Sequence, residues 1–301
     1  MNEPILSLCL PTNGVIEWVF PVLDSIYNQN ADLNMFEIIV TDNGDNKEFE
    51  NKMLRYKENY SNLIYKKTTS YMFYNQLDAL KLANGKYLKF VNHRGLFVDG
   101  ALEKMIELVC KNEENKPVIF FGNGVLKDNV YKLKNFDDFV STIGHLASWT
   151  TGVGIWKDDY DKIPENIKID KISPHSCILF SERHKNEYLI DNSIFSKEIV
   201  VDQSKKGTYD LFKGFAVEEI TITLNLFIDG DISANTFKKV KNDYKKFVAD
   251  LYWQYIIEKR PCSYDLFGFE DAMGIFFTKK EIIFEVILLI LNKIKNKIVR
   301  G

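Results

Sequence analysis

Short apolar runs alternate with amphipathic segments along the first part of the chain. Apolar residues at helical spacing predict helices near residues 19–26, 47–60, 74–82 and 100–109. Strands are predicted at the apolar runs between them, Ile5 to Leu10, Phe36 to Val40, Leu63 to Lys66, Tyr87 to Val91 and Val118 to Phe121. Strands that alternate with helices call for a largely parallel sheet covered by helices on both faces. The sequence therefore predicts an α/β fold.

Polar loops follow three of the predicted strands. They read Pro11-Thr12-Asn13-Gly14, Thr41-Asp42-Asn43-Gly44 and Asn92-His93-Arg94-Gly95. In an open α/β sheet, ligands bind beyond the carboxyl ends of the strands, so we expect the functional site where these loops meet. Two further features are local. Pro21 is expected near the start of the first helix, and Gly122-Asn123-Gly124 favours a hairpin.

The pattern is weaker after residue 125 and becomes helical beyond about residue 207. Gly152 to Trp156 predicts a strand, and Ser173-Pro174 predicts a helix start with Ser173 as the N-cap. Ser233 is expected to cap a long helix toward Lys259, and Lys279 to Val299 predicts a last helix. We therefore expect an α/β domain over residues 1–207 and a helical region over residues 208–301.

Composition narrows the class of protein. A chain of 301 residues with 46% apolar residues can bury a real core, and a net charge of −3 offers no general reason to bind nucleic acid. The four cysteines are far apart and lack metal or redox spacing, so we expect reduced thiols in the cytoplasm: Cys9, Cys110, Cys177 and Cys262. No export signal and no membrane-spanning run are expected.

Three segments, in order, resemble the family 2 glycosyltransferases of the GT-A fold. They are residues 7–13 (SLCLPTN), 36–44 (FEIIVTDNG) and 83–90 (ANGKYLKF), followed by Gly100-Ala101-Leu102. The resemblance covers about residues 5–110. It implies a GT-A, Rossmann-like sheet with the C-terminal helices as an extension. It also implies inverting transfer of a sugar from a nucleotide sugar to a glycan or lipid-linked acceptor, as in bacterial surface polysaccharide synthesis. A catalytically degenerate binding or scaffold domain is the alternative.

The resemblance also implies residues for donor binding. By position, Thr12 and Asp42 would hold the nucleobase, because a fixed carboxylate accepts a hydrogen bond from a ring N–H. An Asx turn between Asp42 and Gly44 is the alternative role for that carboxylate. Other residues at the strand ends complete the expected nucleotide-sugar site: Pro11, Asn13, Asn43, Asn92 and His93. Asn75, at the start of a predicted helix, is expected to face the donor, with capping of that helix as the alternative.

The chain departs from the family at its centre. The family carries an Asp-x-Asp type motif that holds a divalent metal, whereas this chain has Asn92-His93-Arg94. Three interpretations stay open. Arg94 neutralises the leaving diphosphate in place of a metal; Asn92 and His93 bind Mn²⁺ or Mg²⁺ weakly; or the site is inactive.

Inverting transfer needs a general base, which in the family is usually a carboxylate at a helix start. Here the helix start presents His175, which the helix dipole would keep neutral, and the carboxylates Asp170 and Asp191 are its rivals. Gly152, Gly154 and Trp156 suggest a wall for the acceptor, with core packing as the alternative.

The last helix is apolar first and basic afterwards. One interpretation places it on an anionic membrane, at the inner face, where lipid-linked acceptors would reside. The other is packing on the catalytic domain or on a partner chain, as in a homodimer.

Overall fold

The computed structural model describes residues 3–29, 31–164, 167–199 and 208–300. The chain divides into two compact units. The first comprises Met1–Phe136 and Leu146–Val200, and the second comprises Asp137–His145 and Val201–Gly301. The boundary predicted at residue 207 lies outside the described residues. The sequence did not indicate that Asp137–His145 would join the helical unit.

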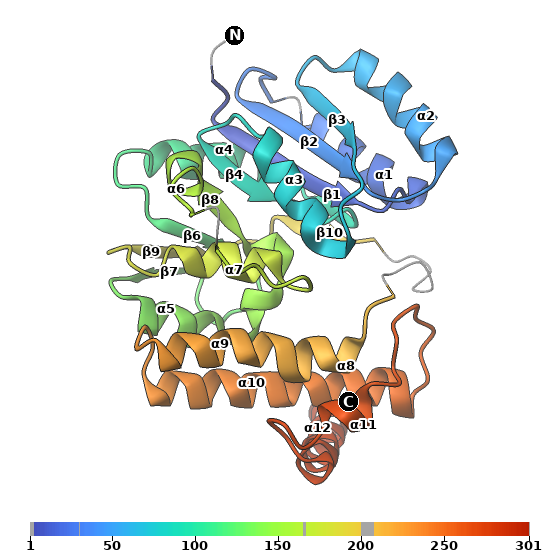
Figure 1. Ribbon diagram of the computed structural model, residues 1–301, viewed down its shortest axis with the longest axis vertical. Helices are drawn as coiled ribbons and strands as arrows, with labels where there is room; N and C mark the ends of the chain where they lie inside the picture. Colours follow the sequence, from blue (N-terminus) through green and yellow to red (C-terminus); the bar gives the residue numbers. More distant parts are fainter. Residues whose placement is uncertain (1–2, 30, 165–166, 200–207, 301) are drawn as a thin grey trace. The chain divides into compact units, whose positions relative to one another are not determined.

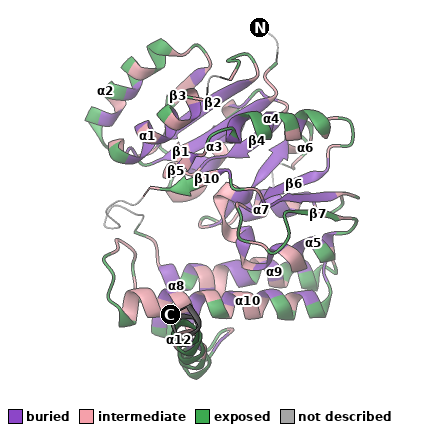
Figure 2. Ribbon diagram, turned by 180° about the vertical axis from the view of Figure 1, so that it is seen from behind, coloured by how far each residue is buried: buried purple, intermediate pink, exposed green. Residues whose placement is uncertain are grey.

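A five-stranded sheet of order β3-β2-β1-β4-β8 forms the centre of the first unit (Figure 1). Four strands are parallel and β8 is antiparallel to β4. The strands are β1 (Leu6–Thr12), β2 (Phe36–Asp42), β3 (Leu63–Lys67), β4 (Tyr87–Phe90) and β8 (Gly154–Trp156). Figure 2 shows these strands mostly as buried. The predicted α/β fold with a mostly parallel sheet is confirmed.

Helices cover both faces of this sheet. Alternate strand residues such as Leu8 and Ile38 share one core with α1 (Ile16–Tyr27), α2 (Lys47–Tyr56) and α4 (Ala101–Lys111). On the other face, α3 (Asn75–Leu82) packs on β1 and β2. Short helical segments complete the connections: η1 (Lys57–Asn59), η2 (Met72–Tyr74), η3 (Gly144–Ser148), η4 (Thr150–Gly152), α6 (Lys157–Tyr160) and α7 (Pro174–Ser181).

A buried carboxylate fixes the amino-terminal ends of the central strands. Glu37 Oε1 accepts hydrogen bonds from Ser7 Oγ at 2.6 Å and from the Gly85 N–H at 3.1 Å. Ser7 Oγ in turn accepts from the Gly85 N–H at 2.8 Å. Since these residues belong to β2, β1 and the turn before β4, the contact sets the relative position of three strands.

A second, three-stranded sheet shows that the predicted hairpin is wrong. Its order is β6-β9-β7, formed by β6 (Val118–Phe121), β9 (Tyr188–Asp191) and β7 (Val130–Leu133). The turn itself forms, because Asn123 and Gly124 adopt φ angles of 52° and 80°. However, β9 inserts between the two strands and pairs parallel to β6. A strand distant in sequence therefore takes the place that a local hairpin partner would occupy.

Of two predicted helix starts, the one at Pro21 is wrong and the one at Ser173 is confirmed. Helix α1 begins at Ile16, so Pro21 lies inside it rather than near its start. The buried side chains Trp18 and Val19 extend the apolar face upstream of the proline, which favours helix there. Ser173 does occupy the N-cap of α7, but its side chain makes no capping hydrogen bond.

The residues predicted as an acceptor wall belong to the core instead. Trp156 is fully buried, and its Nε1 donates to the Pro117 carbonyl at 2.8 Å. A Cβ atom at Gly152 would overlap the ring of Phe120, and one at Gly154 would overlap that of Tyr87. The glycines permit close packing of aromatic rings, so the core-packing alternative is correct.

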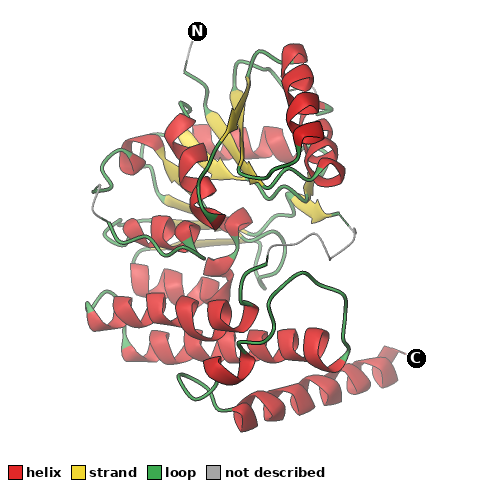
Figure 3. Cartoon of the chain, turned by 45° about the vertical axis from the view of Figure 1, so that its right-hand side comes forward, coloured by secondary structure: helices red, strands yellow, loops and turns green. Residues whose placement is uncertain are grey.

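The second unit is a helical assembly whose predicted helices are confirmed (Figure 3). Ser233 Oγ accepts from the Thr236 N–H at 3.2 Å and caps α10, and Lys245 of α10 pairs with Glu285 of α12 at 3.0 Å. Across the described residues, no helix is long and apolar enough to span a bilayer. The helical segments of the second unit are α5 (Phe136–Ile143), α8 (Leu211–Lys213), η6 (Gly214–Glu218), α9 (Glu219–Ile228), α10 (Ala234–Tyr252), η7 (Trp253–Ile257), α11 (Phe269–Ala272) and α12 (Lys279–Arg300).

Replacing Gly152 with Ala should lower the free energy of unfolding by about 1 to 3 kcal/mol, because the added methyl group must displace the Phe120 ring. Gly95→Ala is the matched control, since a Cβ there meets nothing closer than 3.4 Å. Urea denaturation of both variants measures the difference. Equal stability of the two would contradict the packing role of Gly152.

Candidate functional site

The carboxyl ends of β1, β2 and β3 are joined by one buried amide. Asn75 Nδ2 donates to the carbonyl oxygens of Thr12 at 3.1 Å and Thr41 at 2.8 Å. Its Oδ1 accepts from Thr68 Oγ1 at 2.8 Å. Thr12 and Asp42 are also direct neighbours in the β1–β2 register. The expected meeting of these strand ends is therefore present, with Asn75 holding the backbone that frames it.

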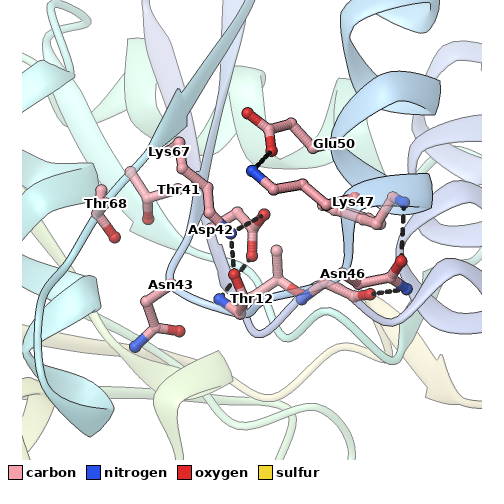
Figure 4. A network of polar contacts seen from close by, with 12 residues as sticks. Thr12, Thr41, Asp42, Asn43, Asn46, Lys47, Glu50, Lys67 and Thr68 are labelled. Atoms are coloured by element: carbon pink, nitrogen blue, oxygen red, sulfur yellow. Dashed lines mark hydrogen bonds and ion pairs between the residues drawn. The ribbon is translucent and has the colours of Figure 1, made fainter.

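Asp42 lies at the centre of a polar cluster (Figure 4). Its Oδ1 accepts from the Gly44 N–H at 2.8 Å, and its Oδ2 accepts from Tyr65 Oη at 3.0 Å and Lys67 Nζ at 3.1 Å. The side chain is fully buried, and Lys67 also donates to the Gly44 carbonyl. The Asx turn to Gly44 is thus formed. Direct contact of Asp42 with a nucleobase stays a prediction.

The neighbouring polar residues shape the rim of this cluster. Asn43 Nδ2 donates to the carbonyl oxygens of Ser70 and Met72, both at 2.9 Å. This holds a loop in which Met72 has the unusual φ of 48°. Pro11 is half-buried and Asn13 is exposed, so both lie where a ligand can reach them.

His93 brings the third strand end to the same place. Its Nδ1 lies 2.9 Å from Thr12 Oγ1, which also accepts from the Gly14 N–H at 3.1 Å. Burial, and then the adjacent Arg94 charge, lower the pKa of His93 to about 3. The imidazole is therefore neutral at physiological pH. Its contact with Thr12 shows that the loop after β4 meets the carboxyl ends of β1 and β2.

Arg94 adds a positive charge at this convergence. Its guanidinium carbon lies 5.3 Å from the centre of the Trp18 ring, and its Nη1 lies 3.4 Å from Glu198 Oε1. Nε and Nη1 are buried and find no hydrogen-bond partner within the described part of the chain. Buried donors of this kind are costly unless a ligand satisfies them.

The side chains that stand where the family carries its Asp-x-Asp motif do not suit a divalent metal as ligands. Asn92 Oδ1 already accepts from the Arg94 N–H at 3.0 Å, and Arg94 places a positive charge beside it. Mg²⁺ and Mn²⁺ prefer anionic oxygen ligands, which this loop lacks. Over residues 3–29, 31–164, 167–199 and 208–300, no three His, Cys, Asp or Glu side chains gather as a metal site.

A buried lysine that sequence reasoning missed lies beneath Asn92. Lys89 Nζ donates to the carbonyl oxygens of Phe90, at 2.8 Å, and Thr151, and lies 4.6 Å from the centre of the Phe121 ring. Burial lowers its pKa to about 7. Lys89 lines a pocket together with Asn92, Asn123 and Ser196. The available signal was a single charged residue inside the apolar run of β4.

Each of the three candidate bases has hydrogen-bond partners within the protein. His175 is buried, with Nε2 2.8 Å from the Ser148 carbonyl oxygen and Nδ1 3.2 Å from Gln76 Oε1, and burial lowers its pKa to about 4. Asp170 Oδ1 accepts from the N–H groups of Ile172 and Ser173. Asp191, at the end of β9, accepts from the Ser193 N–H at 2.8 Å. The base assignment stays a prediction.

A mostly parallel sheet brings Thr12, Asp42 and His93 together at the carboxyl ends of its strands, which is where open α/β sheets bind their ligands. The model of glycosyl transferase family 2 matches residues 7–157, and the chain belongs to this family. The match extends beyond the residues 5–110 in which the sequence resemblance was found. No protein with a curated function matches the chain by sequence.

Solved structures with the same fold share little sequence with this chain. The structure of S. aureus TarS 1–349 in complex with UDP-GlcNAc is 13% identical, with a TM-score of 0.58 over 90% of this chain and 80% of that one. The mannosyltransferase PcManGT from Pyrobaculum calidifontis, in complex with GDP-Man and Mn²⁺, is 13% identical, with a TM-score of 0.52 over 80% and 69%. The longer S. aureus TarS structure is 13% identical, with a TM-score of 0.53, and 84% of this chain spans only 43% of its length.

The Asp42–Lys67 pair should contribute measurably to stability. Asp42→Asn keeps the acceptor for the Gly44 N–H but removes the charge, so we expect a loss of about 1 to 2 kcal/mol, limited by the 32% exposure of Lys67. Lys67→Met should lower the free energy of unfolding by a similar amount, and the double variant should lose little more than either single variant. A urea-denaturation double-mutant cycle measures this coupling.

The exposed pair Lys47–Glu50 provides the matched control. Its cycle of Lys47→Met and Glu50→Gln should give a coupling too small to measure, because solvent screens the pair. Purely additive losses at Asp42 and Lys67 would contradict the structural role of their ion pair.

Proposed function

We propose that this glycosyltransferase moves a sugar from a nucleotide-sugar donor to a glycan or lipid-linked acceptor in bacterial surface polysaccharide synthesis. The observation that carries the proposal is the Thr12–His93 contact, with Arg94 beside it, at the carboxyl ends of β1 and β4. The TarS and PcManGT structures hold UDP-GlcNAc and GDP-Man, which supports a nucleotide-sugar donor for this fold. Such an acceptor would place the protein at the cytoplasmic face of the membrane.

The nucleoside would lie over the rim formed by the loops after β1, β2 and β3. Asp42 and Thr12 are buried, so in this proposal they hold the shape of the rim. The direct polar contacts come from groups that remain partly or fully exposed there: Asn13, Asn43, Lys67 and Thr68. Their amide, ammonium and hydroxyl groups suit the edges of a base and a ribose.

The diphosphate would be bound by Arg94 rather than by a metal. A guanidinium with unsatisfied donors can form forked hydrogen bonds to phosphate oxygens and stabilise the charge that develops on the leaving group. PcManGT was solved with Mn²⁺, so a metal serves at least one protein of this fold. The side chains Asn92, His93 and Arg94 do not offer the ligands that such an ion prefers.

The reaction would invert the anomeric centre. The acceptor oxygen forms a bond to the anomeric carbon as the bond to the diphosphate breaks, and a base takes the acceptor proton. Asp170 suits the base role best, because it is partly exposed just before α7 and two backbone N–H groups orient it. His175 is less suited, since both ring nitrogens have partners and its pKa of about 4 makes it a weak base.

Purified protein should bind and slowly hydrolyse at least one member of a panel of UDP-, GDP-, CDP- and dTDP-sugars. Thermal shift measures binding, and release of the nucleoside diphosphate measures turnover. Chelation with EDTA should leave the rate unchanged, because the site lacks metal ligands. Binding without turnover, with or without Mn²⁺, would favour the degenerate domain, and the absence of binding would refute both functions.

Arg94→Gln should lower the turnover of the best donor by about 10²-fold or more, while its KM changes less, because the charge on the leaving diphosphate is largest in the transition state. Arg55→Gln, at an exposed position on α2, is the matched control and should retain the parent rate. Steady-state kinetics at several donor concentrations separate kcat from KM. A change confined to KM would remove Arg94 from the chemical step.

A further inference from the structure

One side of α12 presents a continuous apolar surface, which we call the α12 face. It consists of six residues whose exposed fractions range from 38 to 59%: Ile283, Phe284, Ile287, Leu288, Leu291 and Ile294. At about 100° per residue, they share one sector of about 140° around the helix. Exposed apolar side chains are common singly, but a contiguous stripe of this length indicates a surface that binds something.

The opposite side of α12 is fixed within its own unit. Ile282 and Val286 are buried, and Glu285 forms its ion pair with Lys245 of α10. The helix therefore already has a partner along one side. The α12 face is directed away from that contact, because it occupies a different sector of the same helix.

The charge of α12 differs in sign from that of the chain. The whole protein has a net charge of −3, whereas the sequence of this helix holds six basic and two acidic residues. Lys280 and Lys295 fall in the same sector as the α12 face, at its two ends, about 22 Å apart along the axis. Of the two acidic residues, Glu285 forms an ion pair with Lys245, and Glu281 accepts a hydrogen bond from the Thr278 N–H. The apolar stripe is therefore flanked by cations.

We propose that the α12 face lies flat on an anionic lipid surface. Its apolar side chains enter the boundary between head groups and acyl chains, and Lys280 and Lys295 meet the negative head groups. A second copy of this chain is a poorer partner, because pairing two α12 faces in either orientation brings lysines of like sign together. This lipid contact belongs to the second unit and does not depend on donor binding in the first.

Sedimentation of the full chain with vesicles tests the proposal. We expect binding to phosphatidylcholine vesicles that contain phosphatidylglycerol, weaker binding at high salt, and little binding to phosphatidylcholine alone. The double variant Ile287→Glu with Leu291→Glu should bind at least about tenfold more weakly, since it places charges in the apolar stripe. Lys280→Gln with Lys295→Gln should weaken binding several-fold and reduce its salt dependence.

The matched control removes two charges elsewhere. Lys57→Gln with Lys111→Gln changes exposed positions of the first unit and should bind vesicles as the parent does. Circular dichroism and thermal shift with a nucleotide sugar confirm that each variant is folded, so loss of vesicle binding is distinguished from loss of donor binding. Equal binding of the parent and the Ile287/Leu291 variant would overturn the proposal. The proposal would also be overturned if the parent protein formed a dimer that did not bind anionic vesicles and that the Ile287/Leu291 variant dissociated.

Discussion

The side chain of Asn75 is the contact on which the framework of the site depends. One buried amide donates to two strand-end carbonyls and accepts from Thr68, so a single side chain joins the carboxyl ends of three strands. At the other end of the strands, the Glu37 carboxylate has the same function for Ser7 and Gly85. Polar side chains thus hold both ends of the central strands, and Thr12, Asp42 and His93 lie at or just beyond the carboxyl ends.

Three basic side chains lie near the carboxyl ends of β3 and β4, each in a different electrostatic environment. The loop after β4 has no carboxylate. Its Arg94 lies against Trp18 and 3.4 Å from Glu198, and its buried Nε and Nη1 have no hydrogen-bond partner in the described part of the chain. Lys67 is neutralised by Asp42, whereas Lys89 is buried among carbonyl oxygens and an aromatic ring. This distribution of charge is the reason for proposing that Arg94, rather than a metal ion, binds the diphosphate.

Several side chains that resemble site residues turn out to be structural, and the reason is burial. Trp156, Gly152 and Gly154 pack the core around β8. His175 is also buried, between Gln76 and the Ser148 carbonyl, but its role as the base stays a prediction. Aromatic, glycine and histidine residues serve equally well in a binding wall or in a core. Only their neighbours in space separate the two roles.

The sequence alone determined the α/β class, the parallel order of strand and helix, the helical C-terminal region and the meeting of Thr12, Asp42 and His93. These follow from periodicity, from turn residues and from the rule that parallel strands end at one edge. It could not reveal the position of β9 between β6 and β7, the assignment of Asp137–His145 to the helical unit, or the partners of Asp42 and Lys89. Those features were decided by tertiary structure, because they depend on contacts between residues far apart in the chain, which local patterns do not encode.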